Sequence, residues 1–219
     1  MKVQINVPDS LKDITLEQYQ RFEKINTEEN KDSSFLLQKM IEIFCNLNLK
    51  DVANIKYNSV QEITNHLNKV FEAKTELITT FKLGGIEFGF IPELDNITLG
   101  EYIDLDTYLG EWDNMKKAMN VLYRPITNKN KNRYTIEDYK KNDNTELLKS
   151  MPLNIVMGSL VFFWNLNKEL LQTTLRYLNK EAKKMNMDQR LVLEENGDGY
   201  PLYTVSHKKM LPNLKISQN

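Results

Sequence analysis

The spacing of apolar residues along the chain predicts a mainly helical protein. A wide apolar stripe over residues 34–48 repeats at intervals of three and four, which is the period of a buried helix face. A second such face, over about 111–123, begins at Trp112, and we expect Pro125 to end that helix. The apolar positions from 151 to 185 predict one long helix near the C-terminal part of the sequence.

Capping patterns mark where several of these helices are expected to begin. Thr15, Ser59 and Thr98 are each followed three residues later by Glu or Gln and then by apolar residues at helical spacing. Ser150 is a further candidate cap, because it lies two residues before Pro152, a residue that suits the first turn of a helix.

Two segments interrupt the helical pattern with signs of β-structure. In residues 79–91, apolar residues alternate on both sides of a Gly-Gly pair, which predicts a β-hairpin. A weaker signal around residues 196–199 predicts a second ribbon, which Pro201 would restrict to a sheet edge. We therefore expect a mainly α fold with a small β part, a helical domain decorated by one or two β-hairpins.

The expected organisation has three parts. Residues 1–126 form a helical N-terminal part that includes the hairpin, and residues 127–149 form a polar connector with loops at 127–133 and 140–146. Residues 150–219 contain the long helix, the ribbon and a basic tail, and the alternative is that all three parts form one single domain.

Charge and cysteine content favour some classes of protein over others, and nucleic-acid binding is the less favoured alternative. The chain has 29 basic and 30 acidic residues and a net charge of −1, whereas proteins that grip nucleic acid through phosphates carry a basic excess. Cys45 is the single cysteine, so no internal disulfide can form, and its apolar surroundings predict a buried core residue. The first residues lack the apolar core of a secretory signal.

Acidic residues between 101 and 113 are the strongest enzyme-like feature, because paired carboxylates can hold a metal or act as acid and base. However, Asp104 and Asp106 are too close in sequence to share a helix face, and no histidine or second acidic motif accompanies them. A solvated or partner-facing acidic surface is favoured. We assign no catalytic residue, no cofactor and no metal site.

The apolar run 151–164 is shorter than the roughly 20 residues that cross a bilayer. It predicts a helix buried in the core or in a partner, and the leucines that follow, 170, 171, 175 and 178, predict an amphipathic docking element. Arg124 is expected to bind a carboxylate or a backbone carbonyl beside Pro125. The candidate interaction residues are Tyr102, Asp104, Asp106, Trp112, Arg124, Phe162, Phe163 and Trp164.

Four segments resemble a family encoded among the virion genes of tailed bacteriophages, with members in crAss-like and marine phages. They are Gly89–Asp106, Trp112–Ile126, Tyr134–Tyr139 and Met151–Leu166. The arrangement of hairpin and helices is more loosely similar to phage tail-assembly chaperones.

This resemblance implies a non-enzymatic morphogenesis protein that acts by protein–protein interaction during virion assembly. It would be a neck, tail or packaged-cargo component, or a tail-assembly chaperone. Its partners would be other phage structural proteins or copies of itself, with no small-molecule substrate, in the host bacterial cytoplasm and, for a structural component, in the virion. The alternatives are an accessory protein that binds nucleic acid or a host protein, and a carboxylate-based metal enzyme.

Overall fold

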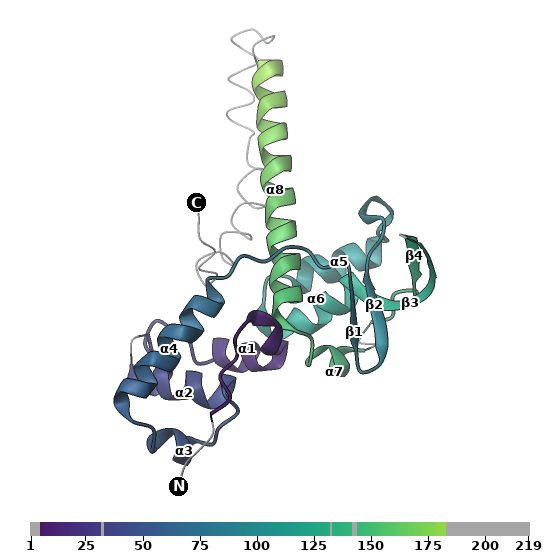
Figure 1. Cartoon of the computed structure of the whole chain (residues 1–219). Helices are drawn as coiled ribbons and strands as arrows, with labels where there is room; N and C mark the ends of the chain where they lie inside the picture. The colour runs from purple at the N-terminus through teal and green to yellow at the C-terminus, as the bar shows by residue number, and fades with distance from the viewer. Residues whose placement is uncertain (1–4, 32, 132, 142–143, 183–219) are drawn as a thin grey trace.

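The structure is a computed structural model that describes residues 5–31, 33–131, 133–141 and 144–182. It is mainly α with a small four-stranded antiparallel sheet, as the sequence predicts. A group of helices and a group built around the sheet lie on either side of the first turns of a long helix, α8 (Leu153–Ala182). Beyond those turns, α8 projects away from both groups (Figure 1).

The helical group follows a short 3-10 turn at Leu11–Asp13. It consists of α1 (Leu16–Glu23), α2 (Ser34–Phe44), α3 (Leu49–Ala53) and α4 (Tyr57–Phe71). The predicted capping box at Thr15 is confirmed: its hydroxyl accepts a hydrogen bond from the Gln18 amide, and the Gln18 side chain accepts one from the Thr15 amide.

The predicted helix start at Ser59 is wrong. The helix α4 begins at Tyr57, with Lys56 at the N-cap position, so Ser59 lies inside the first turn. The physical reason is local packing, because Ile55 contacts a small apolar cluster that contains Cys45 and Val52. This contact fixes the chain just before it turns into the helix.

The sheet has the strand order β1-β2-β3-β4, and every neighbouring pair is antiparallel. The strands are β1 (Thr80–Leu83), β2 (Ile86–Phe90), β3 (Tyr123–Asn130) and β4 (Arg133–Ile136). The predicted hairpin is confirmed, with Gly84 and Gly85 at φ 57° and 82°, the left-handed conformation that glycine adopts without strain.

The predicted loop over residues 127–133 is wrong. The strand β3 continues to Asn130, and Lys129 lies opposite Tyr134 in β4. The hydroxyls of Thr127 and Thr135 are also hydrogen bonded across the two strands, at 2.8 Å. The interval 127–149 is therefore more than a polar connector, since it also includes the short helix α7 (Thr145–Leu148).

Between the two hairpins the chain forms α5 (Leu99–Tyr108) and α6 (Met115–Leu122). The capping box at Thr98 is confirmed, because the Thr98 hydroxyl and the Glu101 carboxylate each accept the other residue's backbone N–H. The second helix ends at Leu122, earlier than predicted, since Tyr123 already pairs with Phe90 as the first residue of β3.

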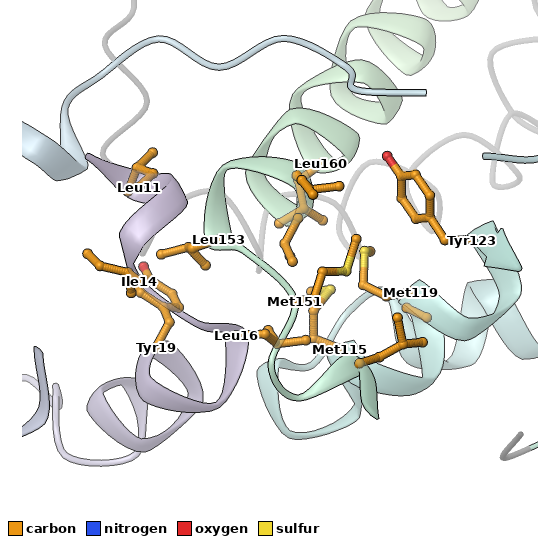
Figure 2. Packing of buried hydrophobic residues seen from close by; sticks show 14 of the residues in the cluster. Leu11, Ile14, Leu16, Tyr19, Met115, Met119, Tyr123, Met151, Leu153 and Leu160 are labelled. Carbon is orange, nitrogen blue, oxygen red and sulfur yellow. The ribbon is translucent and has the colours of Figure 1, made fainter. Parts of the chain in front are cut away.

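The main core combines both groups with the first turns of α8. Figure 2 shows Leu16 from the helical group, Met119 from α6 and Leu153 from α8 around Met151, and all four side chains are fully buried. Backbone hydrogen bonds join Leu16 to Met151 at 2.9 Å and Leu153 to Ile14 at 2.8 Å. Leu148 of α7 is also fully buried in this core, which thus draws residues from all three predicted parts, whose division into domains stays a prediction.

The long helix predicted over 151–185 is present as α8, which the structure describes as far as Ala182. The predicted ribbon around 196–199 and the basic tail, residues 207–219, lie outside the described residues.

Candidate functional site

The base of α8 is held by a close backbone contact at Gly158. A Cβ atom at this position would lie 2.1 Å from the carbonyl oxygen of Glu76, in the connection between α4 and β1. Since real Cβ atoms do not approach a carbonyl oxygen so closely, only glycine fits this crossing without movement. The crossing fixes the connection across the first turns of α8.

A buried hydrogen-bonded group next to this crossing ties α8 to the sheet. The Tyr123 hydroxyl donates to the Ile78 carbonyl at 2.8 Å and lies 2.9 Å from the Ser159 hydroxyl. The Ser159 hydroxyl also lies 3.0 Å from the carbonyl of Ile155, to which it can donate. Burial raises the pKa of the Tyr123 phenol, which keeps this group protonated and able to donate. The base of α8 therefore has a fixed position.

Three aromatic residues, Phe162, Phe163 and Trp164, lie where α8 leaves the core, and we call them the exit aromatics. Phe162 and Phe163 both pack on Phe90 of β2, with ring centroids 5.7 and 6.3 Å from its ring. Trp164 lies under the Lys168 ammonium, 5.2 Å from the ring centroid. All three are only partly buried by the rest of the chain.

Apolar residues continue along α8 beyond the exit aromatics. Exposure rises along one line of residues spaced seven apart, from Val156 (0%) through the half-buried Phe163 to Leu170 (57%) and Tyr177 (64%). Because a step of seven returns a helix to nearly the same face, this line extends the buried face of α8 into solvent. Leu171 follows Trp164 by the same step and is 36% exposed.

We call Leu170, Leu171 and Tyr177 the distal stripe. Figure 1 shows the half of α8 that contains them standing clear of the helices and strands of the body. The side chains of Leu175 and Leu178, also predicted to face a partner, are outside the described set. The sequence predicted the two leucines of the distal stripe through their spacing, whereas Tyr177 was not assigned.

Two of the predicted interaction residues have structural roles. Arg124 forms an ion pair with Glu101 at 2.7 Å, and both side chains are at least nine-tenths buried. The other Glu101 oxygen caps α5 by accepting the Thr98 amide at 2.8 Å. The prediction that Arg124 binds a carboxylate is therefore confirmed, and the pair joins the start of α5 to β3.

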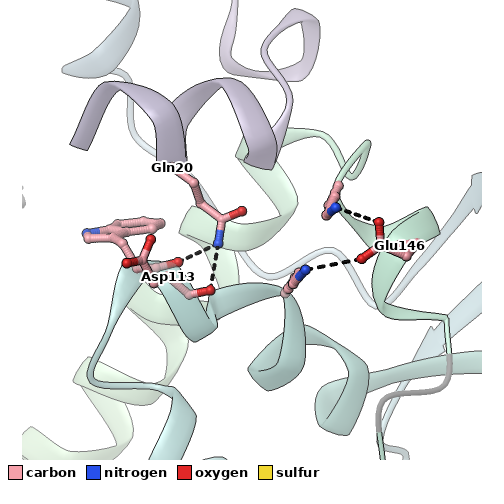
Figure 3. Close-up of polar contacts among 6 residues, drawn as sticks. Gln20, Asp113 and Glu146 are labelled. Atoms are coloured by element: carbon pink, nitrogen blue, oxygen red, sulfur yellow. Dashed lines mark hydrogen bonds and ion pairs between the residues drawn. The ribbon is translucent and has the colours of Figure 1, made fainter. Parts of the chain in front are cut away.

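Trp112 is the second residue with a structural role. It is half-buried and packs against Tyr19 of α1, with ring centroids 4.6 Å apart. Its carbonyl accepts a hydrogen bond from the Gln20 side chain at 2.5 Å (Figure 3). Figure 3 also shows Glu146 of α7 bound by Lys116 and Lys149. The contacts of Trp112 and the Lys116–Glu146 pair have no signal in the sequence, because those partners lie far apart along the chain, whereas Lys149 lies only three residues from Glu146.

Asp104 and Asp106 point to different surroundings. The Asp104 carboxylate accepts hydrogen bonds from Lys141 and from the Tyr139 hydroxyl, each at 2.8 Å, and these bonds hold its pKa below the usual range. Asp106 is exposed on the opposite side of α5. The two carboxylates therefore do not form a shared site.

Asp106 lies instead with Leu99, Tyr102 and Ile103, which are 74%, 46% and 53% exposed. We call these four residues the α5 face. Of them, only Tyr102 and Asp106 are among the interaction residues predicted from the sequence. The missed residues could have been found from the helical period, because Leu99 and Ile103 lie opposite the buried Leu105 and Tyr108.

The possible metal ligands are not grouped in the described ranges, and the single thiol is buried. Within them, no group of three or more His, Cys, Asp or Glu residues is arranged to hold a metal ion. Cys45 is buried, and burial raises the pKa of its thiol to about 11, so the thiol is protonated at neutral pH. None of the helices in these ranges combines the length and apolar character needed to cross a bilayer.

Comparisons of the chain with known protein families, with curated proteins and with solved structures found no match.

Proposed function

We propose that this is a non-enzymatic bacteriophage morphogenesis protein that acts by protein–protein interaction, with α8 as its docking element. The observation that supports docking is the distal stripe, an apolar helix face that continues from the core into solvent. The bacteriophage assignment rests on the sequence resemblance alone.

A protein partner for the distal stripe is supported by the energetics of an unpacked apolar helix face. In proteins most of the stability of a helix comes from tertiary packing of its apolar face, and the distal half of α8 receives little packing from the body. Burying a leucine side chain that was exposed contributes about 1.5–3 kcal/mol. A partner helix or groove that covers Leu170 and Leu171 would thus stabilise both the helix and the complex.

The direction of α8 also suits this role. Gly158 and the Tyr123–Ser159 hydrogen bond fix its base, so the distal stripe is presented at a defined angle to the body. A pre-positioned helix loses less conformational freedom on binding than a free segment does. Assembly proteins that must join in one geometry benefit from this arrangement.

The test of the proposed function is the phenotype of a phage that carries the gene. Deleting the gene should abolish infectious particles while leaving genome replication intact. Mass spectrometry of purified wild-type particles then separates a structural or cargo component, which is present, from an assembly chaperone, which is absent. Normal particle yield from the deletion mutant would contradict the proposal.

A further inference from the structure

The α5 face is a second exposed apolar surface, separate from α8. Leu99, Tyr102 and Ile103 follow the i, i+3, i+4 pattern of one helix face, and Asp106 continues that face by one turn. Leu99, with 74% of its surface exposed, is the most exposed of the large apolar residues in the described ranges. An apolar helix face with an acidic end is suited to bind a segment that is both apolar and basic.

The chain around the α5 face is strongly acidic. Between Leu83 and Met115 there is no lysine or arginine, but there are the acidic residues Glu87, Glu93, Asp95, Glu101, Asp104, Asp106, Glu111 and Asp113. Four of these form ion pairs with basic residues elsewhere: Glu87, Glu101, Asp104 and Asp113. The other four are exposed, and none has an ion-pair partner in the part of the chain that the structure describes.

The sequence contains a segment of complementary chemistry. Residues 207–216, HKKMLPNLKI, combine Lys208, Lys209 and Lys215 with four apolar residues. No acidic residue occurs from 199 to 219. This segment lies outside the described residues.

We propose that residues 207–216 bind the α5 face of the same chain, with their apolar side chains against Leu99, Tyr102 and Ile103 and their lysines beside Asp106. The proposal does not depend on the function of α8. Opposite charges at the rim of an apolar contact set its register and exclude acidic competitors.

The chain that follows α8 is long enough for residues 207–216 to reach the α5 face. The helix α8 has 30 residues and is about 45 Å long at 1.5 Å per residue. From Ala182 to Lys208 an extended chain reaches up to about 85 Å. Residues 207–216 can therefore return from the tip of α8 to the α5 face of the same molecule.

Disulfide trapping in the full chain tests the proposal. The variant Ile103→Cys/Leu211→Cys places one thiol on the α5 face and one in the segment, while the buried native Cys45 remains unreactive. The control Leu49→Cys/Leu211→Cys uses a residue of similar exposure on α3, 44% against 53%. Mild oxidation should cross-link the first pair at least about tenfold faster, through the raised effective concentration of a bound segment.

Non-reducing gels show where the cross-link forms. A cross-linked monomer joins position 103 to position 211 within one chain and supports the proposal, whereas a cross-linked dimer without that monomer, which thiols at equivalent positions of two chains can also form, would overturn it. Equal cross-linking rates for the two pairs, or no cross-link from Cys at 103, would overturn it.

A charge exchange provides an independent measurement. Adding Asp106→Lys to the cross-linking variant should slow trapping several-fold, and adding Lys208→Glu and Lys209→Glu to that variant should restore the rate. Slowing by Asp106→Lys without restoration, or no slowing, would show that the lysines do not face Asp106 and would overturn the proposed register.

Discussion

Buried charge in the described ranges is concentrated in the ion pair between Arg124 and Glu101. We predict that Arg124→Met lowers the free energy of unfolding by about 3–5 kcal/mol, because it leaves the Glu101 carboxylate buried without its cation. Urea denaturation measures this change. The matched control, Lys24→Met, breaks an exposed pair with Asp113 and should cost less than about 1 kcal/mol. Similar losses for the two variants would contradict the structural role of Arg124.

The ionisation of one residue, Asp104, should make the free energy of unfolding depend on pH. Its pKa is lowered in the folded state by the hydrogen bonds from Lys141 and Tyr139, so its contribution is present above the unfolded pKa of about 4 and is lost as pH falls. We predict that Asp104→Asn is less stable than wild type at pH 7 and that the difference shrinks near pH 3. Denaturant titrations at both pH values test this.

Asp138 is the matched control for that experiment. It is exposed and has no ion-pair partner among the described residues, so Asp138→Asn should leave stability almost unchanged at both pH values. A difference between Asp104→Asn and wild type that persists at pH 3 would show that the effect is not electrostatic.

At the scale of elements, two of the three predicted capping boxes are correct, whereas pairing between distant residues was not predictable. The capping boxes at Thr15 and Thr98 were correctly predicted because their hydrogen bonds join residues three apart. The hairpin of β3 and β4 was missed because most of its residues are polar and exposed, without the apolar alternation that reveals a half-buried strand. Arg124 was predicted to bind a carboxylate, but only the fold identifies it as Glu101.

The crossing of α8 by the α4–β1 connection gives a prediction at this scale. Gly158→Ala should lower the free energy of unfolding by about 1–3 kcal/mol, because the new Cβ would overlap the Glu76 carbonyl and displace the connection. In the control Gly100→Ala, the new Cβ meets nothing within 4 Å, so α5 should gain up to about 1 kcal/mol. Equal stability of the two variants would show that the crossing adapts without cost.

At the scale of the whole molecule, the sequence predicted the fold class and the long C-terminal helix, but not where that helix leaves the body. The same apolar period runs through its buried and its exposed parts, so the pattern alone cannot separate a core helix from a docking helix. The distinction depends on how far the two groups of elements reach along α8. Because these groups end near Phe162, Phe163 and Trp164, the three side chains are half-buried and do not lie in the middle of the core.

The central claim is that the distal stripe binds a protein partner during assembly. The most direct measurement is the yield of infectious particles from a phage carrying Leu170→Glu/Leu171→Glu, compared with the control Gln172→Glu on another face of α8. We predict that the double variant keeps its stability to within about 0.5 kcal/mol per substitution, as exposed sites do, yet loses particle formation, while the control assembles normally. Normal yield from a stably folded double variant would contradict the claim.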